Sequence, residues 1–257
     1  MPRDFFMELF LEILILLGLF ALGTATFTLS TISGGGGAMM QIPILNFVLG
    51  TAQTAPVINL GAFISRPARI ALFWKHIHWN VFWYYVPPAM IGALLAAWLF
   101  TEVKIYWVQL LVGLFLISTF FQYRFGKKER SFPVKLWHFI PLGFFVSIIG
   151  TFTGGMGPIL NPFLMNAGID KEELVATKAA QSFFLGISQV GGYAFFGLLS
   201  KELWIYGIAL GLGASLGNYF GKKILKKMSK RSFRKWVISL MVMSGFVLLI
   251  KAWIELQ

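Results

Sequence analysis

The chain has 257 residues, of which 57% are hydrophobic and 12% charged, and its mean hydropathy is +0.74. These values exclude an ordinary soluble domain and predict an all-α integral membrane protein. The net charge of +12 does not indicate a nucleic-acid partner, because the basic residues lie in short loops between apolar runs. Cysteine is absent, which excludes disulfide and thiol chemistry.

Ten apolar segments are predicted, five on each side of a basic middle loop. About 20 apolar residues suffice to cross the hydrocarbon core of a bilayer as a helix. The second segment of each set has only eight or nine residues, about half the length needed. The first segment is too long for the apolar part of a signal peptide, so we expect it to be retained. The segments cover about residues 5–32, 42–49, 56–74, 81–100, 105–123, 136–152, 159–167, 174–199, 203–224 and 236–254.

Loops rich in lysine and arginine orient these segments in the bilayer. The middle loop (residues 124–135) and the last loop (residues 222–235) are both basic, which predicts that both are cytoplasmic. An even number of crossings must separate them, so each short segment counts as a crossing and each half contains five. We therefore expect two inverted membrane repeats, residues 1–123 and 136–257, joined by a cytoplasmic linker at 124–135, with both termini outside the cytoplasm. Re-entrant short segments would instead give eight crossings.

A glycine-rich motif occurs once in each half. The first contains four consecutive glycines, Gly34–Gly37, and the second contains three glycines within residues 154–157. The two motifs are 119 residues apart (154 minus 35), and the same offset places Pro43 on Pro162. Each glycine costs a helix about 1 kcal/mol relative to alanine, so both motifs predict a break in the helix. Such a duplicated break is the best sequence indicator of a transporter's central site.

The first motif is followed by Thr-Ala-Pro-Val-Ile-Asn-Leu-Gly at residues 54–61, and the second by an Ala-Thr-Lys-Ala segment at 176–179. In this pairing the chain resembles the TauE/SafE sulfite-exporter family of anion transporters. The resemblance implies export or uptake of small sulfur-containing anions, such as sulfite, sulfoacetate or related organosulfonates, or of organic acids, across the bacterial inner membrane. The chain departs from the family pattern at Met156, which interrupts the second glycine motif, and at Asn59, where a small hydroxyl residue is commonest.

An anion in the membrane centre must be held by hydrogen-bond donors, and the backbone N–H groups at the start of a half-helix supply them. The alternative is that the glycines only permit close packing of helices. Among the uncharged polar residues, Asn161 ranks first because it follows the second glycine motif directly. The predicted substrate-binding residues are Gly35, Gly36, Gly37, Gln41, Asn59, Gly154, Gly155, Gly157, Asn161, Thr177, Lys178 and Gln181.

Lys178 is the most informative charge of this set. A cation at the centre of a membrane segment costs at least about 2.5 kcal/mol and indicates a functional site by default. At the offset of 119 residues Lys178 aligns with Asn59, which would be the matching donor from the other half, and Thr177 and Gln181 lie within one turn of it. The alternative is that Lys178 extends back to the lipid headgroups as an interfacial anchor.

Arg66 and Arg69 lie three residues apart on one helix, where a guanidinium could pair with an oxyanion. We consider them as a gate or entrance, the alternative being that they only orient the protein. The histidines His76, His78 and His138 are interpreted as interfacial residues, since their spacing does not predict a metal site.

No cofactor, metal or catalytic residue is expected, so the chain is not predicted to be an enzyme. The acidic residues inside the predicted spans are Glu8 and Glu12, both near the outer end of the first span, so no carboxylate relay for proton coupling is evident. We therefore expect facilitated export by alternating access, driven by the substrate gradient and the membrane potential. An anion channel, a permease for another small organic acid and a non-catalytic membrane accessory subunit remain alternatives. The expected partners are the anion and the lipid bilayer, and the sequence does not set the oligomeric state.

Overall fold

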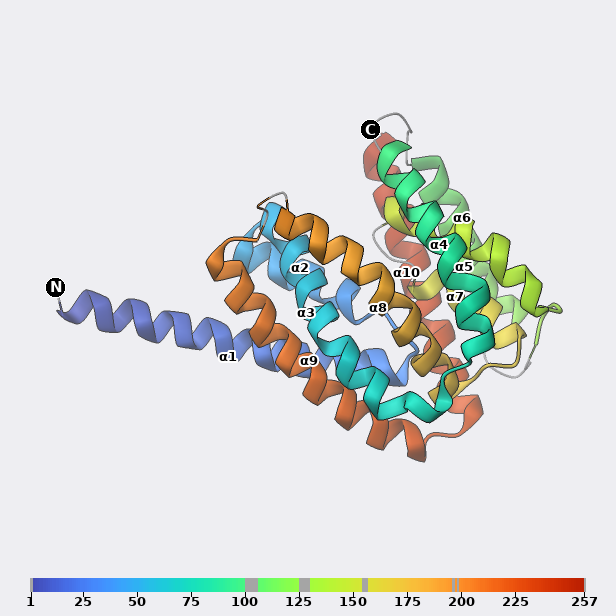
Figure 1. The fold of residues 1–257 in the computed structure, drawn as a ribbon, viewed down its shortest axis with the longest axis horizontal. Helices are drawn as coiled ribbons and strands as arrows, with labels where there is room; N and C mark the ends of the chain where they lie inside the picture. The colour runs from blue at the N-terminus through green and yellow to red at the C-terminus, as the bar shows by residue number, and fades with distance from the viewer. Residues whose placement is uncertain are drawn as a thin grey trace. The chain divides into compact units, whose positions relative to one another are not determined.

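A computed structural model describes residues 2–99, 106–124, 130–153, 157–195, 197 and 199–256. The regular secondary structure of these residues is entirely helical, which confirms the predicted all-α class (Figure 1). The helices are α1 (Pro2–Ile32), α2 (Gly37–Leu49), α3 (Thr51–Phe73), η1 (Trp74–His76), α4 (Trp79–Leu99), α5 (Tyr106–Gln122), η2 (Leu136–His138), α6 (Phe139–Thr153), α7 (Gly157–Asn166), α8 (Lys171–Phe195), α9 (Lys201–Lys227) and α10 (Lys230–Leu256).

The α-helices follow the order of the predicted apolar segments, but the second helix is longer than the sequence suggested. Helix α2 has 13 residues and α7 has 10, against the expected eight or nine. The expectation for α2 was wrong because the helix begins at Gly37, within the glycine run itself. Among the described residues, Met7–Ile32 and Lys230–Ile250 form helices long and apolar enough to cross a membrane. The ten-crossing topology and the inverted repeats stay predictions.

Three consecutive glycines separate α1 from α2. Gly34, Gly35 and Gly36 have φ angles of 71°, 140° and 88°, a region of backbone conformation that side chains with a Cβ rarely adopt. A right-handed helix cannot pass through such residues, so α1 ends at Ile32 and a new helix begins at Gly37. The predicted helix break is therefore confirmed at the first motif. At the second, Gly154 and Gly155 lie outside the described residues.

The chain forms two compact units, each built from both halves of the sequence. Unit 1 consists of Met1–Thr31, Gly37–Leu72 and Ser182–Lys223. Unit 2 consists of Ile32–Gly36, Phe73–Gln181 and Ile224–Gln257. The predicted division into residues 1–123 and 136–257 concerns an internal repeat, and that relation stays a prediction.

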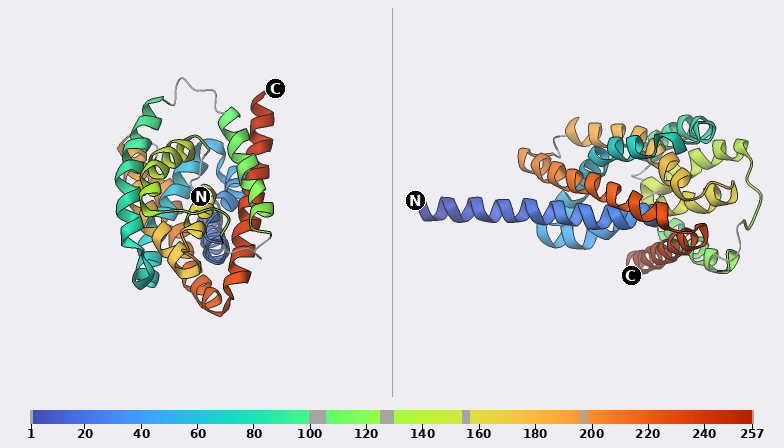
Figure 2. Two further views of the ribbon diagram at one scale, coloured as in Figure 1. Left: turned by 90° about the vertical axis from the view of Figure 1, so that its right-hand side faces the viewer. Right: turned by 90° about the horizontal axis from the view of Figure 1, so that it is seen from below.

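In unit 1, α1 and α9 lie side by side (Figures 1 and 2). Their backbones approach so closely that a Cβ at Gly213 would lie 2.0 Å from the Phe20 carbonyl oxygen. The Thr24 hydroxyl donates a hydrogen bond across the contact to the Gly213 carbonyl at 3.1 Å, and Thr28 does the same to Gly217 at 3.2 Å. Small residues and bridging hydroxyls are the usual means by which helices associate in membranes.

In unit 2, helices pack in the pairs α4 with α6 and α5 with α10 (Figure 2). Glycines lie at both contacts. A Cβ at Gly143 would lie 2.4 Å from the Tyr85 carbonyl oxygen, and one at Gly113 would lie 2.9 Å from the Gly245 carbonyl oxygen. Gly113 and Gly143 therefore serve helix packing, which is the alternative role considered for the motifs themselves.

The α1–α9 contact predicts opposite effects for two glycine substitutions. Gly213→Ala should lower the stability of the fold by about 1–3 kcal/mol, because the new methyl group overlaps the α1 backbone. Gly18→Ala should be neutral or stabilising by up to about 1 kcal/mol, because nothing lies within 4 Å of its Cβ position and alanine favours a helix. Thermal unfolding of the purified variants in detergent tests this. Equal unfolding temperatures for the two variants would contradict the close contact.

Candidate functional site

The first glycine motif contributes its loop, Gly34–Gly36, to unit 2. The loop rests on side chains of α8 and α10. A Cβ at Gly34 would lie 2.9 Å from Leu174, and one at Gly36 would lie 2.6 Å from Leu240. Both the positive φ angles and the lack of space therefore require glycine here.

Lys178 of α8 connects this loop to α7. Its Nζ donates hydrogen bonds to the Gly34 carbonyl oxygen and to Asn161 Oδ1, the latter at 2.5 Å. A Cβ at Gly35 would lie 2.8 Å from the same Nζ, so the absence of a side chain at Gly35 makes room for the ammonium group. Lys178 thus contacts both predicted donor segments. These contacts favour the interpretation as a site residue over the alternative of an interfacial anchor.

Two buried side-chain amides lie near Lys178: Asn161 contacts it directly, and Gln181 follows it by three residues on α8. Asn161 is 0% exposed, and its Nδ2 has no hydrogen-bond partner among the described residues. Gln181 is 2% exposed and is three residues beyond Lys178 on α8, so the two side chains lie on the same side of the helix. Neither Nε2 nor Oε1 of Gln181 has a partner in the described part of the chain. A buried donor without a partner costs about 1–3 kcal/mol, so these amides make this place the candidate site for a ligand.

Helix α7 adds the positive end of its dipole. It begins at Gly157 with Pro158 in the first turn, where the missing proline N–H costs no helical hydrogen bond. The free N–H groups of a first helical turn and the helix dipole both favour an anion. Asn161 is the fifth residue of this helix, so its amide lies one turn beyond the helix start.

The polar residues around α7 hold the site in place. Asn166, the last residue of α7, accepts hydrogen bonds from the backbone N–H groups of Ser131 and Phe132 at 2.6 and 3.0 Å. Its Nδ2 donates to the Tyr123 hydroxyl oxygen at 2.6 Å and to the Pro162 carbonyl oxygen at 2.8 Å. These bonds fix the C-terminal end of α7 against the chain that follows α5.

A buried ion pair fixes the connection between α7 and α8. Arg234 of α10 lies 3.1 Å from Asp170, and the two side chains are only 5% and 12% exposed. Sequence reasoning missed this pair, because the two residues are 64 positions apart and no local pattern connects them. Thr177 is also engaged: its Oγ1 accepts a hydrogen bond from the His78 backbone N–H at 3.0 Å and so anchors the chain before α4.

The remaining predicted binding residues belong to unit 1. A Cβ at Gly37 would lie 2.9 Å from Ser30 Cβ, which is consistent with a packing role. Gln41 donates to Thr26 Oγ1 at 2.8 Å, while its Oε1 is buried without a partner among the described residues. Asn59 donates to the Tyr193 hydroxyl oxygen at 3.2 Å. Its role as the counterpart of Lys178 stays a prediction.

The two arginines predicted as a gate or entrance differ in their surroundings. Arg69 is extensively bonded: its Nε donates to Asn218 Oδ1 at 2.7 Å and its Nη2 to Thr31 Oγ1 at 3.1 Å. The guanidinium also lies over the ring of Phe27, with Cζ 5.3 Å from the ring centroid. Arg66, by contrast, has a buried Nη1 without a partner in the described part of the chain. Of the two, Arg66 is the arginine whose buried donor has no partner among the described residues.

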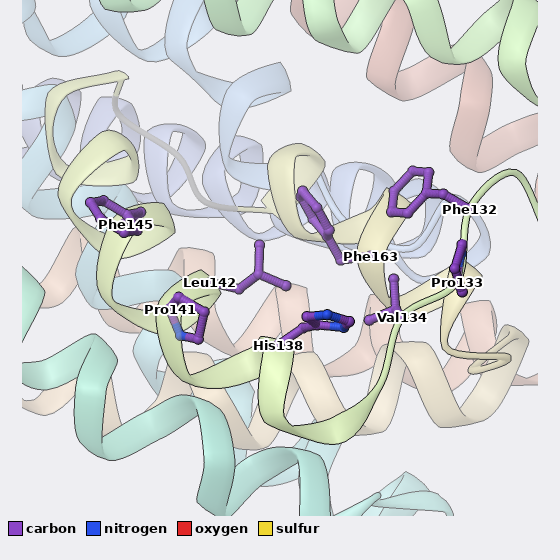
Figure 3. Close-up of a pocket in the computed structure, with 8 residues that line it drawn as sticks. All are labelled: Phe132, Pro133, Val134, His138, Pro141, Leu142, Phe145 and Phe163. Carbon is purple, nitrogen blue, oxygen red and sulfur yellow. The ribbon is translucent and has the colours of Figure 1, made fainter.

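Unit 2 also has an apolar pocket of about 330 Å³, which contains none of the predicted site residues (Figure 3). His138 is its one titratable lining residue, and the Nδ1 of that histidine accepts a hydrogen bond from the Lys135 backbone N–H at 2.8 Å. The pocket offers no cationic group to an anion. It is lined by Phe132, Pro133, Val134, His138, Pro141, Leu142, Phe145 and Phe163.

Comparison with protein families gives one match, to the model described as "Sulfite exporter TauE/SafE", over residues 19–248. This chain belongs to that family. The match includes both glycine motifs, Lys178 and Asn161, and it identifies the chain as a membrane transport protein of the sulfite-exporter type. Comparisons with curated proteins and with solved structures gave no match.

The buried ion pair predicts a large effect of one acidic substitution on stability. Asp170→Asn should cost about 3–5 kcal/mol, because it leaves the Arg234 guanidinium buried without its counter-charge. The control is Glu173→Gln, which removes an exposed contact to His78 (3.1 Å, side chains 42% and 44% exposed) and should cost less than about 1 kcal/mol. Chemical or thermal unfolding in detergent measures both. Similar losses in the two variants would argue against a supporting role for the buried pair.

Proposed function

We propose that this member of the TauE/SafE family is a secondary transporter that exports small sulfur-containing anions across the inner membrane, and that its anion site includes Lys178, Asn161 and Gln181. Sulfite, sulfoacetate and related organosulfonates are the proposed substrates. The observation that carries the proposal is the contact of the Lys178 ammonium group with Asn161 and the first glycine loop, together with the buried Asn161 Nδ2 and Gln181 amide, which have no partner among the described residues.

The donors of this site match the chemistry of a sulfur oxyanion. The Lys178 ammonium group supplies the positive charge, and the Asn161 and Gln181 amides supply neutral N–H donors that can replace part of the hydration shell. The N-terminus of α7 adds a partial positive charge. A mixture of one full charge and several neutral donors suits a transporter, which must bind its substrate firmly enough to select it and weakly enough to release it.

The glycine loop sets the space available beside the ammonium group. Gly35 has a φ of 140°, and any side chain there would contact Lys178 Nζ. The lysine can therefore approach the loop backbone, and an anion bound by the lysine can lie against peptide groups rather than aliphatic carbon. In this proposal Gly157 provides backbone at the start of α7, and Gly154 and Gly155 remain predicted binding residues of the second motif.

The proposed mechanism is alternating access without proton coupling. In the part of the chain that the structure describes, Asp170 is buried against Arg234 and is thereby committed to a structural ion pair. The acidic residues within the predicted spans are Glu8 and Glu12, both near the outer end of the first span. The substrate gradient and the inside-negative potential would then drive an anion outward, while the two inverted halves move against one another.

The first functional prediction concerns the charge of Lys178. Lys178→Gln should lower the initial rate of sulfite uptake into proteoliposomes by about tenfold to a hundredfold, the equivalent of one charge-assisted hydrogen bond. Lys135→Gln is the matched control, since Lys135 is exposed and contributes only its backbone to a described hydrogen bond. Unchanged uptake by Lys178→Gln, with the protein folded, would make the lysine an anchor and refute the site.

The second functional prediction concerns the driving force. Sulfite movement should respond to an imposed membrane potential and to the sulfite gradient, because the substrate carries the only charge that moves in this mechanism. A pH gradient at zero potential should have no effect beyond changing the ionisation of sulfite, for which a permanently charged organosulfonate is the control. Strict dependence of organosulfonate transport on a proton gradient would refute uncoupled export.

A further inference from the structure

Helix α3 carries two arginines one turn apart, and the structure gives them different roles. Arg69 is fixed by Asn218 and Thr31 and by its position over Phe27. The same Asn218 donates from Nδ2 to the Ser65 carbonyl oxygen at 3.3 Å, immediately before Arg66. Asn218 of α9 therefore connects to α3 at both Arg69 and Ser65, and these bonds hold this turn of α3 against α9 within unit 1.

Arg66 follows Ser65 on this turn of α3, and part of its guanidinium makes no hydrogen bond to the described residues. Its Nη1 is buried and has no hydrogen-bond partner among the described residues, and none of their ion pairs involves it. The neighbouring residue is Gly186 of α8, where a Cβ would lie only 1.8 Å from Arg66 Nη1 and 3.0 Å from Cζ. The guanidinium thus occupies the space that any side chain at position 186 would fill.

An aromatic pair borders the same place. The rings of Phe63 and Phe183 stack with centroids 5.2 Å apart and an interplanar angle of 3°. Phe63 Cδ2 lies 3.0 Å from the Cβ position of Gly186. The donor edge of Arg66 is therefore next to apolar surface, where a charged group without an acceptor is expensive and an incoming anion would gain most from it.

We infer that the Arg66 guanidinium, seated against Gly186, forms a second anion-binding position contained within unit 1, whereas Lys178 belongs to unit 2. Its ligand is an oxyanion with at least two oxygens on one centre, because a guanidinium offers two parallel N–H groups to such a ligand. A sulfite or sulfonate and the phosphate of a lipid headgroup share this chemistry. The choice of sulfur oxyanions rests on the proposed function, whereas the position itself rests on the geometry of Arg66.

The test measures sulfite binding to the purified full-length protein by calorimetry, without requiring transport. In a Lys178→Gln background, sulfite should still bind, and adding Arg66→Gln should weaken that binding about tenfold or more. Arg66→Lys keeps the charge but loses the two parallel N–H donors of the guanidinium, and should also weaken binding. Gly186→Ala should do so as well, by displacing the guanidinium. Lys223→Gln is the control in unit 1, since Lys223 is exposed beside Tyr219.

A second arm identifies the source of the oxyanion. Delipidated protein is titrated with phosphatidylglycerol, and the rise in unfolding temperature is compared between the parent and Arg66→Gln. A reduced rise with unchanged sulfite binding supports the position with a lipid phosphate as ligand. Reduced sulfite binding supports it with a free anion, even if the parent fails to transport sulfite and the proposed function is wrong. If Arg66→Gln and Arg66→Lys fold normally and change neither sulfite binding nor the rise in unfolding temperature with lipid, the inference is overturned.

Discussion

The hydrogen bonds of Lys178 to the Gly34 carbonyl and to Asn161 are the interactions on which the candidate site depends. They join three segments that are far apart in the sequence: the start of the first glycine motif, the first turns of α7 and the N-terminal part of α8. Each segment is unfavourable alone, because a glycine run does not favour a helix and a lysine or an amide is costly in apolar surroundings. Together they satisfy some of one another's hydrogen-bonding groups. The buried Asn161 Nδ2 and the Gln181 amide are left without a hydrogen bond to the described residues.

The supporting structure in unit 2 explains how such a site can be kept in place. Asn166 binds the chain after α5 at one end of α7, and the Asp170–Arg234 ion pair holds the following loop against α10. These groups are polar and buried, yet they use their donors and acceptors on the protein itself. Asn161 and Gln181 are equally buried but keep amide atoms without a partner among the described residues. Burial therefore does not separate the structural polar residues from the candidate ligand-binding ones, whereas the hydrogen bonds do.

The sequence predicted the features that depend on local chemistry. Apolar runs located the α-helices, consecutive glycines located the break before α2, and the position of Lys178 inside an apolar helix identified the central charge. The sequence could not assign different roles to Arg66 and Arg69, because both are arginines on the same helix. They differ only in their neighbours in space: Arg69 bonds to Asn218 and Thr31, and Arg66 lies against Gly186. The Asp170–Arg234 pair was missed because its two residues are 64 positions apart and meet only in the folded chain. The start of α2 was misplaced because glycine disfavours a helix on average, although Gly37 has helical neighbours that stabilise it.

The two cations proposed to meet the substrate differ in a way that suits different tasks. A lysine ammonium group is a compact charge on a flexible stem, so Lys178 can exchange one acceptor for another with little change in the backbone. The guanidinium of Arg66 is planar and lies against the α8 backbone at Gly186, so it can accept only a ligand that fits its orientation. An anion bound at Lys178 is therefore recognised mainly by charge, and one bound at Arg66 mainly by shape. A transporter that selects sulfur oxyanions among the many small anions of a cell needs the second kind of recognition as well as the first, because charge alone does not distinguish them.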